Sequence, residues 1–420
     1  MKWIYRVGIF FARMLLLLGA LFIPKIRHFT SSRKNLFQSL KAFRVKYPGS
    51  LAWFHVASLG EYEQARPVIA ELKRENPAKL IAVSFFSPSG YDHAIKKPQA
   101  QVDFITYLPL DSKHQAEEFV RTLNPDLVFF VKYDLWYHHI MAVKARNTLL
   151  FLFSAAFRPD QIYFKRDGFF RQIVFQFDYI FTQNQPTVDL LKSINYQQTC
   201  VAGDTRFDRV AETANNFKEF PALAKWVGEK PTLVAGSVWQ EDMELLIPVM
   251  NANPEYRWII APHDISPEPM MRWSDLLELK SSRYSQWDSD LSPDVIFIDN
   301  IGMLSSLYQF AKVAYVGGGL GKGLHNILEP LGFGIPVIFG KLEKTAKFPE
   351  AAESQKNGCG FEVSDEANLK LIFEKLEHPD FYYKSAEAAK TWVNMNIGAA
   401  ERIVNKVEEL VSNSRKWPKA

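Results

Sequence analysis

Residues 313–339 read VAYVGGGLGKGLHNILEPLGFGIPVIF, and this stretch contains an apolar run, a glycine-rich turn, the start of a helix and a second apolar run. The two apolar runs, 313–316 and 336–339, have the length of short buried strands. A strand, a helix and another strand in this order are typical of a βαβ unit, in which the two strands are parallel. The stretch therefore predicts a parallel sheet flanked by helices.

The same alternation of apolar runs and amphipathic stretches extends through most of the chain, with helical periods such as 63–75, 113–123 and 241–250 between the runs. We expect strands at 51–56, 80–85, 104–108, 127–131, 149–153, 179–182, 232–235, 258–261, 295–298, 313–316 and 336–339. These two series of strands predict an α/β protein with two doubly wound domains.

The expected domain boundaries follow from this pattern and from composition. Residues 1–24 form an apolar N-terminal segment, 25–210 the first domain, 211–230 a polar, proline-containing linker, and 231–420 the second domain. We leave open whether the last helices pack back on the first domain. A chain of 420 residues is long enough for two such cores, since single cores seldom exceed about 250–300 residues.

Composition narrows the class of protein further. With 47% hydrophobic and 23% charged residues the chain is globular rather than disordered, and two cysteines, Cys200 and Cys359, fit a reducing compartment. Residues 1–60 hold ten Lys or Arg and no acid, although the net charge of the whole chain is only +4. A basic N-terminus on a body without excess positive charge argues against a nucleic-acid partner and favours a membrane surface with anionic lipids.

The apolar run 3–23 is interrupted by Arg6 and Arg13 and closed by Pro24. Its length is close to the roughly 20 residues that span a bilayer, but two arginines in its first half favour a shallow helix. A cleaved signal peptide and a buried core helix remain alternatives. We expect an uncleaved anchor or an interfacial helix, and the Lys and Arg that follow it place the body on the cytoplasmic side.

The turn after the strand at 51–56 reads Ala57-Ser-Leu-Gly-Glu61. A carboxylate at the start of a helix lies among unpaired backbone N–H groups, which stabilise its ionised form and suit it to accept a proton. Glu61 is therefore a candidate general base, although a helix-capping role explains an isolated carboxylate equally well. Ser58, Gly60 and Arg66 are candidates for binding an acceptor beside it.

Two glycine-containing turns are candidates for binding a phosphate or a sugar. Gly236-Ser237 ends one strand, and Gly318-Gly319 begins the glycine-rich loop that leads to His325, Asn326 and Glu329. Such loops admit a ligand close to bare backbone, and a carboxylate can accept hydrogen bonds from a ribose. The loop is neither a dinucleotide fingerprint nor a Walker loop, since Gly323 follows the lysine.

Several motifs together resemble the 3-deoxy-D-manno-octulosonic acid (Kdo) transferases of lipopolysaccharide assembly. They are SLGEYEQARP at 58–67, DLW at 134–136, GDTRFD at 203–208, AGS at 235–237 and GGGLGKGLHNILEP at 317–330. The resemblance covers about residues 50–340 and implies the GT-B fold, with two Rossmann-like domains facing a cleft. It also implies inverting transfer of Kdo from CMP-Kdo to a lipid A precursor, lipid IVA, at the cytoplasmic face of the inner membrane of Gram-negative bacteria.

The resemblance assigns roles to individual residues. Glu61 is implied as the catalytic base, and Arg206 as a cation that stabilises the transition state where a Lys is usual, although a structural salt bridge explains Arg206 equally well. The positions implied to contact CMP are Pro262, His263, Ile301, Gly302, Met303, Asn326, Ile327, Leu328 and Glu329. His263 stands in place of an Arg, and Lys132 in place of a common Glu.

We expect no metal and no cofactor, because backbone N–H groups and cations can neutralise the phosphate of the donor. The one DxD sequence, at 288–290, lies in a polar stretch that is typical of a solvated loop. Two other functions stay open: a GT-B transferase or epimerase acting on a different nucleotide sugar, and a non-catalytic membrane scaffold.

Overall fold

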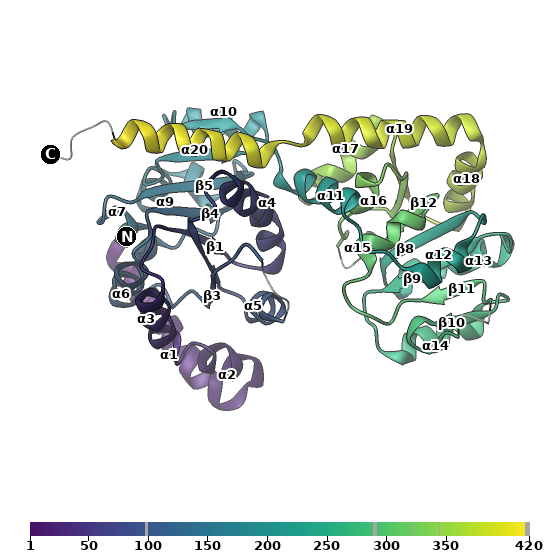
Figure 1. Cartoon of the computed structure of the whole chain (residues 1–420), viewed down its shortest axis with the longest axis horizontal. Coiled ribbons are helices and arrows are strands. Elements are labelled where there is room, and N and C mark those ends of the chain that lie inside the picture. Colours follow the sequence, from purple (N-terminus) through teal and green to yellow (C-terminus); the bar gives the residue numbers. More distant parts are fainter. Residues whose placement is uncertain (97–99, 289–291, 322, 344, 416–420) are drawn as a thin grey trace. The chain divides into compact units, whose positions relative to one another are not determined.

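The structure is a computed structural model that describes residues 1–96, 100–288, 292–321, 323–343 and 345–415. The chain divides into two units, each built on its own seven-stranded sheet (Figure 1). The first unit contains residues 1–209 together with 398–420, and the second contains 210–397. The segment 211–230, expected as a linker, holds the end of one helix and the whole of another and belongs to the second unit.

The first unit has the strand order β3-β2-β1-β4-β5-β6-β7, and its paired strands are parallel. Its strands are β1 (Leu51–Val56), β2 (Leu80–Phe85), β3 (Phe104–Tyr107), β4 (Leu127–Val131), β5 (Leu149–Ala155), β6 (Tyr179–Thr182) and β7 (Thr199–Val201). Its helices are α1 (Lys2–Phe22), α2 (Pro24–Ser31), α3 (Leu36–Lys46), α4 (Leu59–Glu75), α5 (Pro88–Ile95), α6 (Lys113–Leu123), α7 (Tyr137–Lys144), α8 (Ile162–Lys165), α9 (Phe169–Val174), α10 (Gln185–Ser193) and α20 (Ala399–Arg415).

Helices cover both faces of this sheet, and each face has its own hydrophobic core. One core joins the sheet to α3, α6 and α7, and the other joins it to α4 and α20. The central strands β1 and β4 are buried along their whole length, which is typical of parallel strands covered on both faces. Asp208 holds the N-terminus of α20 by accepting hydrogen bonds from the backbone N–H groups of Gly398 and Ala400.

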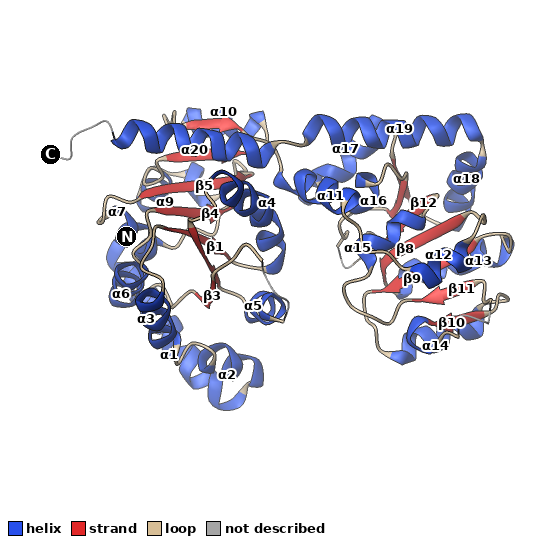
Figure 2. Cartoon of the chain, in the orientation of Figure 1, coloured by secondary structure: helices blue, strands red, loops and turns tan. Residues whose placement is uncertain are grey.

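The second unit has the order β10-β11-β9-β8-β12-β13-β14, again parallel (Figure 2). Its strands are β8 (Thr232–Val238), β9 (Arg257–Pro262), β10 (Ser281–Arg283), β11 (Val295–Phe297), β12 (Val313–Val316), β13 (Val337–Gly340) and β14 (Gly360–Val363). Its helices are α12 (Pro221–Val227), α13 (Gln240–Ala252), α14 (Pro267–Leu276), α15 (Leu304–Leu307), α16 (Leu328–Gly332), α17 (Pro349–Asn357), α18 (Glu366–Glu377) and α19 (Pro379–Asn396), and α11 (Thr205–Asn215) crosses the boundary between the units.

The N-terminal helix α1 is long and apolar enough to cross a membrane, and none of its residues is fully buried. It nevertheless contacts the rest of the first unit. Near its start, the Tyr5 hydroxyl donates a 2.5 Å hydrogen bond to the buried carboxylate of Asp111, and the Tyr5 ring packs on Tyr137 and Phe169. At its other end, Arg27 of α2 donates to the carbonyl oxygens of Ala20 and Leu21, which joins α1 to the next helix. The start of α1 is therefore held on the first unit.

Candidate functional site

The carboxyl edge of the first sheet holds the candidate base, Glu61. Strand β1 ends at Val56, α4 begins at Leu59, and Glu61 lies in the first turn of α4. Its Oε2 accepts a 2.5 Å hydrogen bond from the backbone N–H of Ala57, so the carboxylate folds back over the turn that precedes its helix. This contact is the capping interaction left open by the sequence. The remaining carboxylate lone pairs can still accept a proton from a substrate.

The surroundings of Glu61 raise its pKa. Burial is the largest cause, and the nearby carboxylate of Asp134 acts in the same direction. The Ala57 hydrogen bond, His55 and Lys132 oppose these two effects but do not cancel them. A carboxylate with a raised pKa binds a proton more strongly, which favours its use as a general base.

His55 and Asp134 form a partly buried polar network beside this base, and no local pattern in the sequence singles out His55. Strand β1 pairs with β4, so His55 lies next to the turn that carries Asp134. His55 Nε2 is 3.3 Å from the Asp134 carboxylate, and its Nδ1 is 3.0 Å from the Ser84 hydroxyl. The Trp136 indole N–H donates a 2.9 Å hydrogen bond to the same carboxylate. The DLW motif thus positions a second negative charge near Glu61.

Lys132 directly follows β4 and has a φ of +60°, in the left-handed region that residues other than glycine rarely adopt. Its charge lowers the pKa of Glu61 and so opposes the effect of Asp134. Strained backbone of this kind is found where a side chain must be held in one direction. Lys132, noted in the sequence only as a departure from the family, is therefore part of the electrostatic setting of the base.

The other candidates in the first unit have different surroundings. Ser58 and Gly60 are exposed in the turn before and at the start of α4. Arg66 forms an ion pair with Glu63 at 3.2 Å, and Glu63 also pairs with Arg209. Arg206 pairs with Asp204 of its own motif, with its Nε 2.8 Å from the carboxylate. The structural salt bridge that was one interpretation of Arg206 is therefore present.

In the second unit, Gly236 and Ser237 lie within β8 rather than in the turn after it. A Cβ at Gly236 would come within 2.2 Å of the Tyr308 hydroxyl and 2.9 Å of Leu304. The glycine is thus required by packing, which corrects the expectation that it leaves room for a ligand. Ser237 has a φ of +54° at a register shift between β8 and β9, so the strand changes direction there.

Packing also explains the first glycines of the loop after β12. A Cβ at Gly317 would meet Asp242, and one at Gly319 would come within 2.2 Å of the Gly340 carbonyl oxygen. Gly318 has a φ of +89°, and its N–H donates a 3.0 Å hydrogen bond to the Asp242 carboxylate. Because this N–H group already donates to Asp242, it is not a free donor for a bound phosphate. Gly321, by contrast, faces open space.

Asp242 organises this loop, and the sequence did not single it out. Its buried carboxylate accepts hydrogen bonds from the backbone N–H of Trp239, the N–H of Gly318 and the hydroxyl of Tyr315. Burial raises its pKa, and the two backbone hydrogen bonds act against that rise. The carboxylate ties the start of α13 to the glycine-rich loop.

Three aromatic rings lie against one another at the carboxyl ends of β8, β9 and β12. Trp239 stacks on His263 with ring centroids 4.1 Å apart, and His263 lies 4.8 Å from His325. The Trp239 indole N–H donates to His325 Nε2 at 3.4 Å. Burial and the neighbouring His263 lower the pKa of His325 to about 4. The neutral His325 ring can therefore accept a hydrogen bond. His263, which follows Pro262, is exposed on the surface, where a ligand can reach it.

Of the motif at 326–329, two side chains point toward solvent-accessible surface and two do not. The Asn326 amide donates to Glu329 at 3.2 Å, and both residues are partly exposed. Ile327 and Leu328 are completely buried. Any contact from these two residues to a ligand must therefore come from their backbone.

Residues 301–303, which the family resemblance also implied to contact CMP, lie beside a separate pocket of about 620 Å³. Ile301 is 74% exposed and Gly302 has a φ of +84°, whereas Met303 is buried. The pocket is also lined by Lys218 and Tyr284. None of the other implied nucleotide contacts lines it.

Among the described residues, no group of three or more His, Cys, Asp or Glu is placed to hold a metal ion. Of the DxD sequence at 288–290, the residues after Asp288 lie outside the described part of the chain.

The sequence is similar to that of known 3-deoxy-D-manno-octulosonic acid transferases. Residues 31–209 match the family model of 3-deoxy-D-manno-octulosonic-acid transferase. The chain is 27% identical over 336 residues to the 3-deoxy-D-manno-octulosonic acid transferase of Aquifex aeolicus, covering 77% of this chain and 85% of the relative. It is 28% identical over 358 residues to the enzyme of that name from Chlamydophila psittaci, covering 79% and 78%.

A solved structure of a putative UDP-N-acetylglucosamine 2-epimerase from Listeria monocytogenes is similar to this fold, with a TM-score of 0.62. It covers 86% of this chain and 97% of the epimerase at 16% identity. At that identity the similarity concerns the fold alone, which is of the GT-B type expected from the sequence.

Proposed function

We propose that this chain is a glycosyltransferase of the Kdo transferase family, to which its sequence is similar. In this proposal it transfers Kdo from CMP-Kdo to a lipid A precursor, lipid IVA, with inversion at the anomeric carbon. The observation that supports this most is Glu61. It lies in the part of the chain that matches the family model, at the carboxyl end of a central parallel strand, where ligands of α/β proteins bind.

Glu61 acts as the general base in this proposal. Its carboxylate takes the proton from the acceptor hydroxyl as the oxygen attacks the anomeric carbon of Kdo, and the bond to CMP breaks. Direct displacement by a deprotonated hydroxyl inverts the anomeric centre. The raised pKa of Glu61 brings its proton affinity closer to that of the attacking group, which favours proton transfer in the transition state.

The second unit binds the donor in this proposal. The Glu329 carboxylate accepts a hydrogen bond from the ribose, and the Asn326 amide donates one to it. The exposed ring of His263, which stacks on Trp239, lies where the phosphate or the base of the nucleotide can contact it. The Asp242 carboxylate does not touch the donor. It holds the loop that carries these contacts.

The N-terminal helix places the protein on the membrane that carries its lipid acceptor. A spanning helix leaves the protein body along most of its length, whereas Tyr5 at the start of α1 and Arg13, Leu16 and Leu17 in its middle lie against other parts of the first unit. We therefore propose that α1 lies in the interface, at the cytoplasmic face of the inner membrane. Its outward side, with Phe10, Phe11, Leu15 and Leu18 exposed, supplies the apolar contact.

Incubation of the purified protein with CMP-Kdo and a lipid A precursor tests the proposal, with mass spectrometry of the lipid as readout. Kdo-bearing lipid and free CMP are expected. Parallel reactions with other nucleotide sugars identify a transferase or epimerase of different donor specificity, which would overturn it.

A further inference from the structure

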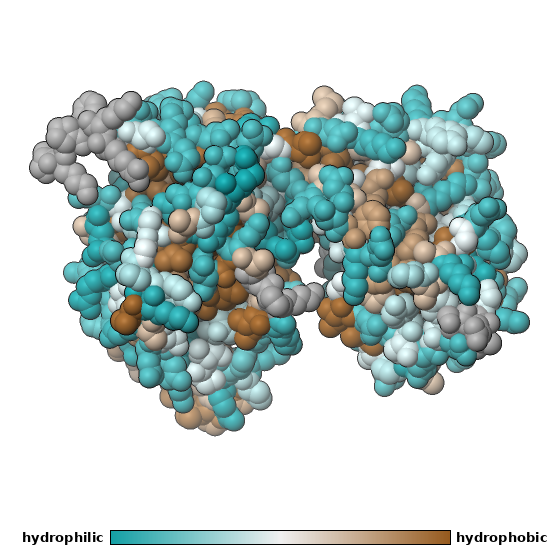
Figure 3. All heavy atoms as spheres, in the orientation of Figure 1, coloured by the Kyte–Doolittle hydropathy of each residue, from teal (hydrophilic) through white to brown (hydrophobic). Residues whose placement is uncertain are grey.

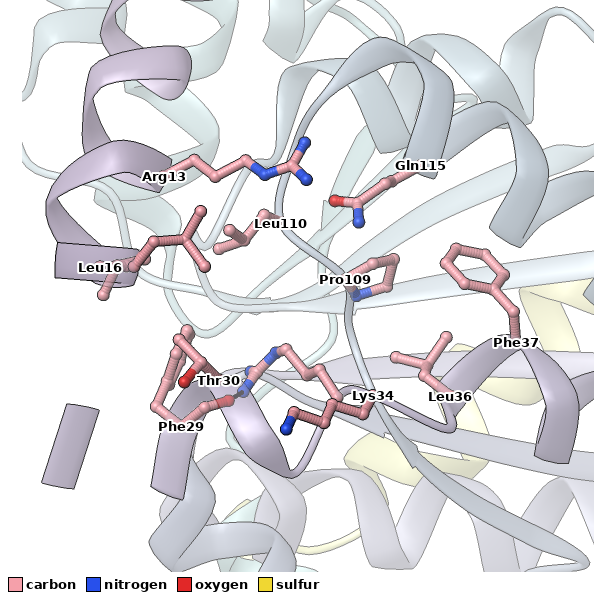
Figure 4. A pocket seen from close by; sticks show the side chains of 12 residues that line it. Arg13, Leu16, Phe29, Thr30, Lys34, Leu36, Phe37, Pro109, Leu110 and Gln115 are labelled. Carbon is pink, nitrogen blue, oxygen red and sulfur yellow. Dashed lines mark hydrogen bonds between the residues drawn. The ribbon is translucent and has the colours of Figure 1, made fainter. Parts of the chain in front are cut away.

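A small pocket lies between α1 and the rest of the first unit (Figure 4). Its volume is about 170 Å³, below the 300–1,000 Å³ typical of sites for whole small molecules. It is formed by the middle of α1, the end of α2, the turn that follows it, the start of α3, the loop after β3 and Gln115 of α6. The described residues that line it are Arg13, Leu16, Leu17, Phe29, Thr30, Arg33, Lys34, Leu36, Phe37, Pro109, Leu110 and Gln115.

Three of these lining residues are cations and none is an acid. Arg33 is occupied, because its guanidinium donates to the backbone carbonyl oxygens of Phe29, Phe86 and Leu108 and lies over the Phe29 ring. Arg33 therefore builds the wall of the pocket.

Arg13 and Lys34 are different. Within the described part of the chain, neither side chain forms an ion pair or a hydrogen bond, and both residues are exposed. Figure 4 shows the Arg13 side chain extending from α1 toward Gln115, with Lys34 on the other side of Leu110 and Pro109 in this view. Two free cations thus flank an apolar floor, an arrangement that favours an anion attached to an apolar group.

The pocket opens beside the exposed apolar side of α1, where Met14, Leu17, Leu18 and Leu21 face solvent. Exposed hydrophobic side chains alone are not distinctive, since Figure 3 shows patches of them on the face that it draws. The pocket differs because its apolar lining lies beside the unpaired cations Arg13 and Lys34. From this juxtaposition we propose that the pocket binds the phosphate of one anionic membrane phospholipid, between Arg13 and Lys34. The first part of an acyl chain lies along Leu16, Leu17 and Phe37.

A headgroup site differs from a general attraction between basic residues and an anionic surface. Diffuse attraction depends on how many charges are present and is nearly indifferent to their positions. A headgroup site depends on Arg13 and Lys34 in particular. The chain offers a matched comparison, because Lys2 and Lys25 are exposed basic residues of the same segment that do not line the pocket.

The test measures binding of dihexanoyl phosphatidylglycerol, below its micelle concentration, to the full-length protein by calorimetry. We expect one saturable site. The double variant Arg13→Gln/Lys34→Gln should bind at least about tenfold more weakly, whereas Lys2→Gln/Lys25→Gln, which removes the same charge, should bind like the wild type. The charge-conserving Arg13→Lys/Lys34→Arg variant should retain binding. Its binding would show that substitution at these two positions does not by itself unfold the pocket.

Three results would overturn the proposal. One is an equal loss of affinity in the two charge-removing variants, which indicates diffuse attraction. Another is equal binding of dihexanoyl phosphatidylcholine, which indicates an apolar site without charge selection. The third is inorganic phosphate binding as tightly as the lipid, which indicates a site for a free anion. Since Kdo transfer is not measured, failure here leaves the proposed enzymatic function to its own test.

Discussion

Replacement of Glu61 by Gln removes the proton-accepting carboxylate but keeps a side chain of the same length. The amide oxygen can still accept the hydrogen bond that Ala57 donates at 2.5 Å, so the start of α4 should keep its conformation. Loss of a general base usually lowers turnover by about 10²–10⁴-fold. A hundredfold loss corresponds to about 2.7 kcal/mol of transition-state stabilisation, since each factor of ten is about 1.4 kcal/mol.

The assay follows Kdo transfer from CMP-Kdo to a detergent-dispersed lipid A precursor at saturating substrate. Glu75→Gln is the matched control, because Glu75 lies at the other end of α4 and, among the described residues, its side chain forms only a surface ion pair with Arg74. We expect near-normal turnover in the control, and unchanged CMP binding and thermal unfolding in both variants. A folded Glu61→Gln variant that turns over like the control would refute the role of Glu61.

Four further outcomes are expected. Because burial raises the pKa of Glu61, the wild-type kcat/KM should fall as the pH is lowered through that raised pKa; a pH profile of Glu61→Gln should lack this acid limb. Glu329→Ala should weaken CMP binding in calorimetry, since a charge-assisted hydrogen bond to the ribose contributes about 1.5–3 kcal/mol; unchanged affinity would move the nucleotide site elsewhere. Asp242→Asn should lower the thermal unfolding midpoint. The carboxylate accepts hydrogen bonds from the backbone N–H groups of Trp239 and Gly318, whereas the NH2 group of an asparagine would face one of these donors and leave it without an acceptor, at a cost of about 1–3 kcal/mol. Tyr5→Phe should lower the stability of the full-length protein by about 1.5–3 kcal/mol in urea unfolding, the scale of a hydrogen bond to a charged group; no change would mean that α1 is not held by Asp111.

The strands of both sheets were largely predictable because they are continuous apolar runs. Strands β1, β2, β4, β6 and β12 begin and end where the sequence pattern places them. The strands missed were β7, β10 and β14, which have three or four residues each and all lie at the edge of a sheet. β10 consists of Ser281, Ser282 and Arg283, so no apolar run marks it.

The candidate base was found from the sequence because it lies within a local motif, a strand followed by a turn and a helix start. The residues that tune it could not be found in this way. His55 and Asp134 are 79 positions apart and meet only because β1 pairs with β4. A buried histidine in a strand gives no local signal of such a partner.

The glycine-rich loop shows the opposite difficulty. The sequence was interpreted as leaving room for a ligand beside the glycines, whereas the first glycines of the loop are required by the packing of the protein itself. At Gly317 and Gly319 the neighbours are the Asp242 carboxylate and the backbone of Gly340. Contacts of this kind depend on strand order, which residue spacing alone does not specify.

Whether the protein transfers Kdo is decided by mass spectrometry of a lipid A precursor after incubation with CMP-Kdo and the purified full-length protein. We expect the lipid mass to increase by that of Kdo, with release of CMP, in a reaction that Glu61→Gln largely abolishes. An unmodified lipid, under conditions in which the protein is folded and binds CMP, would contradict this expectation.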